Sequence, residues 1–226
     1  MSESARARAR RLASQYVSSG DPIGWFEALY QMARGDARQV QWADLAVNPH
    51  FAAWTRRRHL IGVGQRALVV GCGLGDDAEH LAGLGFRVVA FDVSPTCIGW
   101  CRRRFPASAV YYTAADLFYS PPDWQHAFDF VLEAYTLQVL PADLRPAAVE
   151  RIVGYVRSGG TLLVVSRGRE PGDDPGQMPW PLTRAELDRF VGLGLQEVSF
   201  SDFLDLEDPP VRRFVAEFRA KEAGQA

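Results

Sequence analysis

The sequence has 226 residues, of which 47% are hydrophobic and 23% are charged. This length and composition suit one well-packed α/β domain and leave little room for a second full domain. The net charge of −2 gives no basis for a general attraction to nucleic acid. No apolar run approaches the ~18 residues that a membrane helix needs, so we expect a protein that binds neither nucleic acid nor membrane.

Cysteine usage points to a reducing compartment. The three cysteines are Cys72, Cys97 and Cys101, an odd number with no recognisable signal peptide, and we therefore expect a cytoplasmic protein without disulfides. Cys97 and Cys101 have helical i, i+4 spacing, but no nearby His or second Cys pair completes a tetrahedral site. We predict buried structural thiols and no bound metal.

Residues 1–60 predict a helical cover that belongs to the same domain as residues 61–226. An aromatic stripe that includes Trp25 and Tyr30 precedes the first predicted strand, and Trp42 follows in a second aromatic island. Such a stripe is consistent with simple helix packing. Because the segment precedes the first strand, its side chains are also candidates to lie across the mouth of a ligand site.

The most informative motif is an apolar run that breaks into three glycines at alternate positions. Ala67–Val70 suits a strand buried on both faces, and Gly71, Gly73 and Gly75 follow it. Glycines at these positions let the backbone turn sharply and approach a ligand without Cβ atoms. The motif therefore predicts a strand, a tight turn and the start of a helix.

Two carboxylates directly after this turn separate the possible ligands. A dinucleotide site places pyrophosphate on the helix N-terminus, where Asp76 and Asp77 would repel it. The spacing is G-x-G-x-G and not G-x-G-x-x-G, and the lysine of a Walker A loop is absent. A turn bordered by carboxylates suits a positively charged ligand, such as the ammonium and sulfonium of S-adenosylmethionine.

Acidic residues also follow the second and third predicted strands. Asp92 ends the strand at 87–91, where a carboxylate reaches the ribose hydroxyls of a nucleotide, although it can also cap the next helix. Asp116 follows the strand at 109–112 and is placed to accept a hydrogen bond from an adenine amino group. Capping of a turn is the alternative role for Asp116.

Further candidates lie beyond the fourth and fifth strands, because ligands of open α/β sheets bind at the carboxyl ends of the strands. The strand at 128–132 leads into three of them: Glu133, Tyr135 and Gln138. The Gly/Pro-rich loop at 167–181 is long enough to be a lid. It adds Met178 and Trp180 as candidates for contact with the substrate.

The remaining pattern completes a single sheet. Helices are expected at 76–84, 95–105, 142–156 and 183–191, the last after a capping box, and strands at 161–165, 196–200 and 211–218. The predicted fold is α/β: a doubly wound, mostly parallel, seven-stranded Rossmann-like sheet with an antiparallel edge strand and an N-terminal helical cover.

Taken in order, these motifs resemble the class I S-adenosylmethionine-dependent methyltransferases over residues 64 to about 218. The resemblance implies S-adenosyl-L-methionine as cofactor and S-adenosyl-L-homocysteine as product. It also implies the cofactor-binding residues Trp42, Gly71, Cys72, Gly73, Gly75, Asp92, Val93, Asp116, Leu117 and Glu133. The chain is loosely similar to the thiopurine and halide methyltransferase group, which includes tellurite-resistance-like enzymes, in its aromatic cover, the Glu133–Pro141 run and the Gly176–Trp180 loop.

The resemblance predicts methylation of a small molecule by in-line displacement, with a soft nucleophile such as a thiol or halide as acceptor. Soft nucleophiles need no base, whereas an alcohol does; the four histidines share no motif. Candidate catalytic residues are Glu133 and Tyr135, and candidate substrate contacts are Trp25, Tyr135, Gln138, Met178 and Trp180. O- or N-methylation of a natural product, a NAD-linked oxidoreductase and a non-catalytic cofactor-binding protein are the alternatives. A monomer or homodimer is expected.

Overall fold

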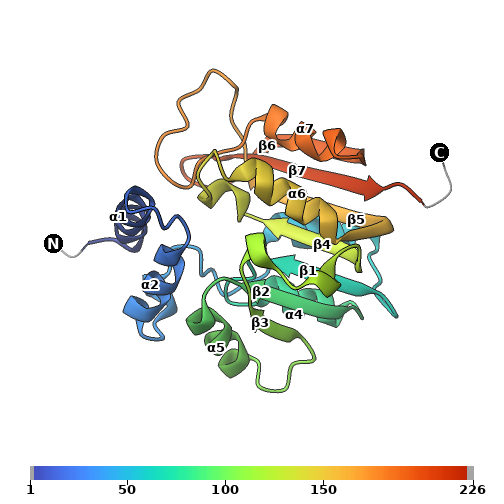
Figure 1. Cartoon of the computed structure of the whole chain (residues 1–226), viewed down its shortest axis with the longest axis horizontal. Coiled ribbons are helices and arrows are strands. Elements are labelled where there is room, and N and C mark those ends of the chain that lie inside the picture. Colours follow the sequence, from blue (N-terminus) through green and yellow to red (C-terminus); the bar gives the residue numbers. More distant parts are fainter. Residues whose placement is uncertain (1–2, 223–226) are drawn as a thin grey trace.

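The computed structural model describes residues 3–222, and within them the strands form one seven-stranded sheet with the order β3-β2-β1-β4-β5-β7-β6 (Figure 1). The strands are β1 (Arg66–Val70), β2 (Arg87–Asp92), β3 (Tyr111–Ala114), β4 (Phe128–Ala134), β5 (Val156–Arg167), β6 (Leu195–Leu204) and β7 (Arg212–Ala220). The helices are α1 (Ala5–Ser18), α2 (Gly24–Ala33), α3 (Pro49–Arg58), α4 (Asp76–Gly83), α5 (Pro95–Arg104), α6 (Arg145–Tyr155) and α7 (Arg184–Gly192).

Strand directions confirm the predicted fold class. β1 to β5 pair in parallel, and β7 runs antiparallel both to β5 and to the edge strand β6. The carboxyl ends of the first five strands therefore meet at one edge of the sheet. In a doubly wound sheet this edge is where ligands bind.

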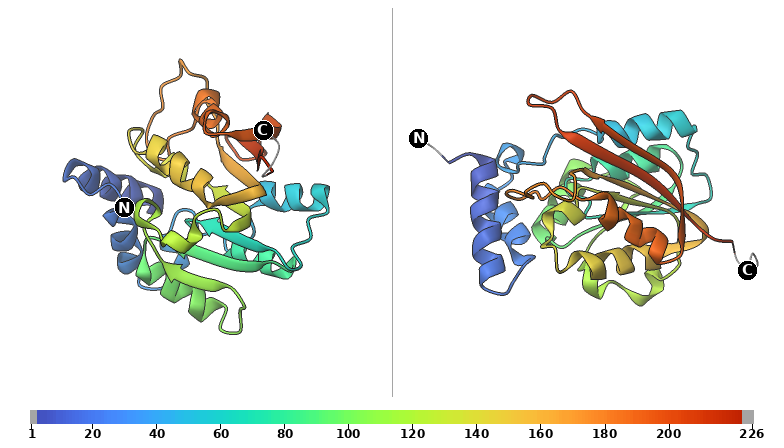
Figure 2. Two further views of the ribbon diagram at one scale, coloured as in Figure 1. Left: turned by 45° about the vertical axis from the view of Figure 1, so that its right-hand side comes forward. Right: turned by 90° about the horizontal axis from the view of Figure 1, so that it is seen from above.

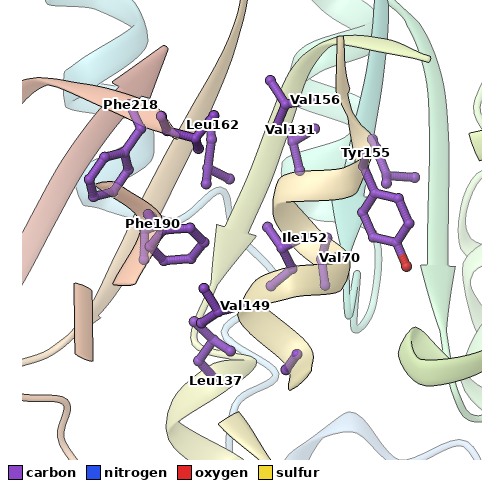
Figure 3. Packing of buried hydrophobic residues seen from close by; sticks show 14 of the residues in the cluster. Val70, Val131, Leu137, Val149, Ile152, Tyr155, Val156, Leu162, Phe190 and Phe218 are labelled. Carbon is purple, nitrogen blue, oxygen red and sulfur yellow. The ribbon is translucent and has the colours of Figure 1, made fainter. Parts of the chain in front are cut away.

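Each face of the sheet has its own apolar core because side chains alternate along the strands. On one face, Val70 and Val131 pack with Ile152 of α6 and Phe190 of α7 (Figure 3). On the other face, Val69 and its neighbours pack against α3, α4 and α5. The view from above in Figure 2 shows the helices flanking the sheet. The strands between them are held rigidly from both sides.

The boundary between α6 and β5 differs from the predicted one. The helix was expected over 142–156 with a stop at Ser158-Gly159-Gly160, but α6 ends at Tyr155 and β5 begins at the next residue. β5 carries these glycines within the strand, where its pairing with β4 shifts register. Gly159 has a φ of 70°, which only glycine adopts readily. The glycines thus bend a long strand and do not separate a helix from a short one.

The predicted cover at residues 1–60 includes α1 and α2, which lie together beyond the edge that holds the carboxyl strand ends (Figures 1 and 2). The Glu27 carboxylate of α2 accepts hydrogen bonds from Ser94 and from Thr96, at the start of α5. The Arg10 side chain of α1 donates to the Met178 carbonyl at 2.7 Å. These contacts fix the cover to the sheet domain. Residues 1–2 and 223–226 of the predicted ranges lie outside the described residues.

No helix within residues 3–222 combines the length and the apolar character needed to cross a membrane.

Candidate active site

A cavity of about 570 Å³ lies at the carboxyl ends of the parallel strands, a volume typical of small-ligand sites. The glycine turn after β1, the ends of β2 and β4, and the cover segment around Trp42 all line it. The residues predicted for cofactor binding that line it are Trp42, Gly71, Cys72, Gly73, Gly75, Asp92, Val93, Asp116 and Leu117. The structure therefore brings together nine residues that the sequence motifs proposed separately.

The glycine turn is held in a conformation that other residues adopt poorly. Gly71 and Gly75 have φ values of 59° and 92°, in the left-handed region that favours glycine. A Cβ atom on Gly71 would lie 2.3 Å from the Thr136 hydroxyl, and one on Gly75 would lie 2.5 Å from the Tyr112 hydroxyl. Both positions thus require glycine for conformation and for space.

Gly73, at the centre of the turn, is held on both sides. Its backbone N–H donates to the Asp92 carboxylate at 3.2 Å. Its carbonyl accepts from the Cys97 thiol at 2.8 Å and from the Cys101 thiol at 3.1 Å. All three cysteines are free and buried, and burial raises the pKa of the Cys97 thiol. Hydrogen bonds from the two thiols thus connect the turn to α5.

Within residues 3–222, no group of three or more His, Cys, Asp or Glu side chains is placed to hold a metal.

Asp92 lines the cavity and is 8% exposed. It accepts hydrogen bonds from the backbone N–H groups of Gly73 and Ser94, while the cap of α5 is the Ser94 side chain and not Asp92. Burial raises the pKa of Asp92 to about 6. Asp116 also lines the cavity, and its side chain accepts from the Phe118 N–H at 2.8 Å. Asp116 therefore does cap a turn, in addition to facing the cavity.

The two carboxylates after the turn are less free than the sequence argument assumed. Asp76 forms a 2.8 Å ion pair with Arg104 of α5. Asp77 accepts from the Asn48 N–H at 2.8 Å, and burial raises its pKa to about 6. Both line the cavity. The negative potential near the turn consequently depends on Asp92 and Asp116 as well as on this pair.

The chemistry of these groups fits S-adenosylmethionine. Asp92 and Asp116 supply carboxylate acceptors for hydroxyl and amino donors. Next to Gly73 the backbone is accessible, since a Cβ there would meet no atom closer than 3.8 Å, the distance to the Trp42 ring. An aromatic wall, a bare backbone turn and acidic acceptors thus face one cavity.

Comparison with known proteins supports this assignment. A family model described as a methyltransferase domain matches residues 67–160. The chain is 27% identical over 156 residues to a probable thiol methyltransferase 2 from Arabidopsis thaliana; the aligned region covers 64% of this chain and 66% of the plant protein. The matched domain and the order of the strands support a class I S-adenosylmethionine-dependent methyltransferase.

Solved structures share the fold of this methyltransferase. One, concerned with the conversion of a disulfide bond into a thioacetal group during echinomycin biosynthesis, has a TM-score of 0.69, 23% identity, and covers 86% of this chain and 92% of its own. Another, the 1,6-didemethyltoxoflavin-N1-methyltransferase of Burkholderia thailandensis with bound S-adenosylhomocysteine, has a TM-score of 0.65, 20% identity, and covers 98% and 92%.

Glu133 does not line the cavity of the methyltransferase. Its side chain is fully buried at the end of β4, where one oxygen accepts from the N–H groups of Thr136 and Leu137 at 2.7 and 2.9 Å. The second oxygen has no hydrogen-bond partner among the described residues. Burial raises the pKa of Glu133 to about 7. The contacts indicate support of the loop after β4, in place of the predicted contact with ligand.

Tyr135 and Gln138 both line the cavity, as the sequence predicted. Tyr135 has a φ of 68°, a conformation that costs free energy in a non-glycine residue and often marks functional sites. The Gln138 side chain accepts from the Arg167 N–H at 2.7 Å, and its carbonyl accepts from the Trp180 N–H, also at 2.7 Å. Gln138 therefore joins β5 and the 168–182 loop to the cavity wall.

Three predicted substrate contacts lie away from the cavity: Trp25, Met178 and Trp180 are not among the residues that line it. Trp25 and Met178 are buried in an apolar cluster between α1, α2 and the 168–182 loop, and Trp180 packs against this cluster. Their apolar surface stabilises the contact between cover and loop. Of this loop, the neighbouring Pro179 reaches the cavity.

Besides Asp76 and Asp77, six charged or titratable residues that were not among the predicted site residues line the cavity: Arg6, Asp44, His50, Arg167, Glu207 and Arg213. Burial and the charge of Arg213 lower the pKa of His50. A signal for His50 was its place in the cover, after the Asn48-Pro49 helix start. The arginines had no local signal, because they come from three segments far apart in the chain.

We expect Asp92→Asn to weaken binding of S-adenosylhomocysteine about 10- to 100-fold, the range for losing a hydrogen bond to a charged group. Because the pKa of Asp92 is about 6, affinity of the unmodified protein should fall as the pH is lowered from 8 to 5 and the carboxylate is protonated. The affinity of the Asp92→Asn variant should not show this pH dependence. Calorimetry at both pH values measures it; the exposed Asp123→Asn serves as control, and an unchanged dissociation constant would reduce Asp92 to a turn support.

Glu133→Gln should stay folded and bind S-adenosylhomocysteine normally, since an amide oxygen still accepts from Thr136 and Leu137. The folded-state pKa is raised from 4.5 to about 7, so the wild-type protein loses stability as pH rises across that interval. The variant should avoid this loss and gain up to about 3 kcal/mol at pH 8 but little at pH 4. Urea unfolding measures the difference, with Glu150→Gln on the surface of α6 as control.

If Glu133 instead acts as a catalytic base, the same variant would lose about 10²–10⁴-fold in turnover while remaining folded. Glu133→Ala, which removes both hydrogen bonds to the loop, should destabilise the protein and reduce binding. The Gln and Ala variants together therefore separate loop support from catalysis.

Proposed function

We propose that the protein transfers a methyl group from S-adenosylmethionine to a small molecule whose acceptor is a soft nucleophile, a thiolate in the first place. The observation that carries the proposal is the single cavity, which continues from the glycine turn and Asp92 to Tyr135, Gln138 and His50. The similarity to a probable thiol methyltransferase supports the choice of acceptor atom.

In the proposed reaction, bound S-adenosylmethionine supplies an electrophilic methyl group on a sulfonium. The residues of the chain bind and orient the reactants. Asp92 and Asp116 provide acceptors at the nucleoside end of the cavity, and the Gly71–Gly75 turn allows close approach of the backbone. Tyr135 and Gln138 border the other end of the cavity, where the molecule that receives the methyl group would bind. Catalysis requires its nucleophilic atom to be held about 3–3.5 Å from the methyl carbon, in line with the bond that breaks.

The carboxylates near the end of the cavity where the methyl acceptor would bind are not placed to act as a base. Glu207 is ion-paired with Arg213, and Glu133 does not line the cavity. His50 packs edge-on against the Phe203 ring, with 5.3 Å between the ring centroids. A thiol, with an ordinary pKa near 8.5, forms enough thiolate near neutral pH to react without assistance.

O- or N-methylation of a natural product is the second candidate, and His50 is the observation that favours it. Burial lowers the pKa of His50 and so favours the neutral imidazole, which is the form that accepts a proton from an alcohol. The similar toxoflavin enzyme is an N1-methyltransferase. The two candidates differ in whether turnover requires His50.

A screen of thiols, halides, phenols, alcohols and amines, with S-adenosylhomocysteine detected as product, tests the proposed function. We expect thiols to be methylated with a kcat/KM at least about tenfold above that of the other classes, as soft nucleophiles need no proton removal in the transition state. If calorimetry shows no binding of S-adenosylmethionine or S-adenosylhomocysteine, the proposed function is refuted.

His50→Asn should leave kcat/KM for thiols within about threefold of wild type, because a thiolate needs no base. The exposed His59→Asn is the matched control. A loss of about 10²–10⁴-fold confined to His50→Asn would instead assign His50 as a general base and favour the second candidate.

A further inference from the structure

Two arginines face each other across the antiparallel ladder at one end of the cavity. Arg167, the last residue of β5, lies directly opposite Arg213, near the start of β7, and both line the cavity. Like charges directly opposite in a sheet destabilise it. The repulsion between Arg167 and Arg213 is therefore unfavourable unless nearby negative charge offsets it.

Arg213 obtains that negative charge from the chain itself. Its guanidinium is 4% exposed, pairs with Asp205 at 2.5 Å and also pairs with Glu207. It lies over the Tyr135 ring, 5.2 Å from the centroid. Arg213 is thus a fixed, neutralised part of the wall behind Tyr135.

Arg167 has no such partner. Its backbone N–H is bonded to Gln138, but none of the residues 3–222 hydrogen-bonds or ion-pairs with its half-buried guanidinium. Burial lowers its pKa, and the charges of Arg213 and Arg6 add to this effect. Glu207 acts in the opposite direction, but that carboxylate is already paired with Arg213. Arg167 remains an uncompensated cation in the cavity wall.

Arg6 adds a third guanidinium from the cover. It lies on α1, lines the cavity and is exposed. Charge differs between the two ends of the cavity: Asp76, Asp77, Asp92 and Asp116 lie near the turn, whereas Arg6, Arg167 and Arg213 line the other end with one carboxylate, Glu207, which is paired with Arg213. Asp44, an exposed residue of the cover, also lines the cavity.

We propose that the methyl acceptor carries an anionic group, a carboxylate in the first place, that binds the Arg167 guanidinium with Arg6 beside it. This inference rests on the proposed function and narrows the acceptor to a small thiol with a carboxylate. The planar guanidinium presents two parallel N–H donors that match carboxylate oxygens. Tyr135 and Gln138 lie on the same wall, so an acceptor anchored there extends toward the glycine turn.

The test compares 3-mercaptopropionate with 2-mercaptoethanol, which differ in the carboxylate. We expect wild type to prefer 3-mercaptopropionate in kcat/KM, and Arg167→Gln to lower that value about 10- to 100-fold with little change for 2-mercaptoethanol. Arg167→Lys should restore part of the loss. Arg151→Gln, exposed on α6, is the matched control, and S-adenosylhomocysteine affinity should be equal in all variants.

A second measurement does not depend on turnover. Sodium propionate, which carries the carboxylate but no thiol, should raise the Tm of wild type above that in sodium chloride of equal ionic strength, because a ligand of the native state stabilises it. Arg167→Gln should lack this shift. Its own Tm should be equal to or above that of wild type, since the repulsion with Arg213 is removed. A purely structural arginine would give the opposite result, a lowered Tm and no effect of propionate.

The outcomes separate the two proposals. Binding of S-adenosylhomocysteine with equal methylation of both thiols by wild type and Arg167→Gln would overturn the anion site and leave the proposed function standing. Failure to bind S-adenosylhomocysteine, together with a propionate shift that depends on Arg167, would refute the proposed function and support the anion site. Absence of any propionate shift in wild type would count against the anion site in either case.

Discussion

The site depends on how Gly73 is held. Its N–H is bonded to the Asp92 carboxylate and its carbonyl to the thiols of Cys97 and Cys101, so the turn is fixed between the end of β2 and the start of α5. Hydrogen bonds to buried groups of this kind are costly to leave unmade. The arrangement of the turn is therefore stabilised by contacts within the protein itself. The Asp92 carboxylate accepts hydrogen bonds from the backbone of the turn, and the residue also lines the cavity.

Charge is distributed unevenly along the cavity that this turn begins. Carboxylates surround the turn, and arginines from β5, β7 and α1 gather at the other end. Opposite charges at the two ends suit two reactants of opposite charge, a sulfonium and an anionic acceptor. Methyl transfer from a sulfonium to a thiolate removes one charge of each sign. The carboxylate that we propose binds Arg167 keeps its charge in the thioether product, so only the sulfonium and thiolate charges are lost between reactants and products.

Much of the site followed from local sequence, because a residue at the end of a parallel strand has its place fixed by the strand. Asp92, Asp116, Tyr135 and Gln138 all line the cavity for this reason. Two kinds of feature could not be predicted from local sequence. Arg167 and Arg213 meet through the register of two strands that are far apart in the chain, and no local pattern encodes register. Trp25 and Met178 were predicted to contact the substrate, but their apolar side chains are buried between the cover and the 168–182 loop.

Glu133 and Tyr135 show how two neighbours in one motif acquire different tasks. Glu133 lies within β4, and its side chain is buried in the protein. Two backbone N–H groups donate to its carboxylate and offset part of the cost of burial. These bonds hold the chain directly after Tyr135, whose positive φ is unfavourable in isolation. Burial of the Glu133 carboxylate raises its pKa, and the same carboxylate stabilises the turn in which Tyr135 lines the cavity. The buried Glu133 carboxylate therefore supports the cavity wall, and Tyr135, which it helps to position, lines the cavity.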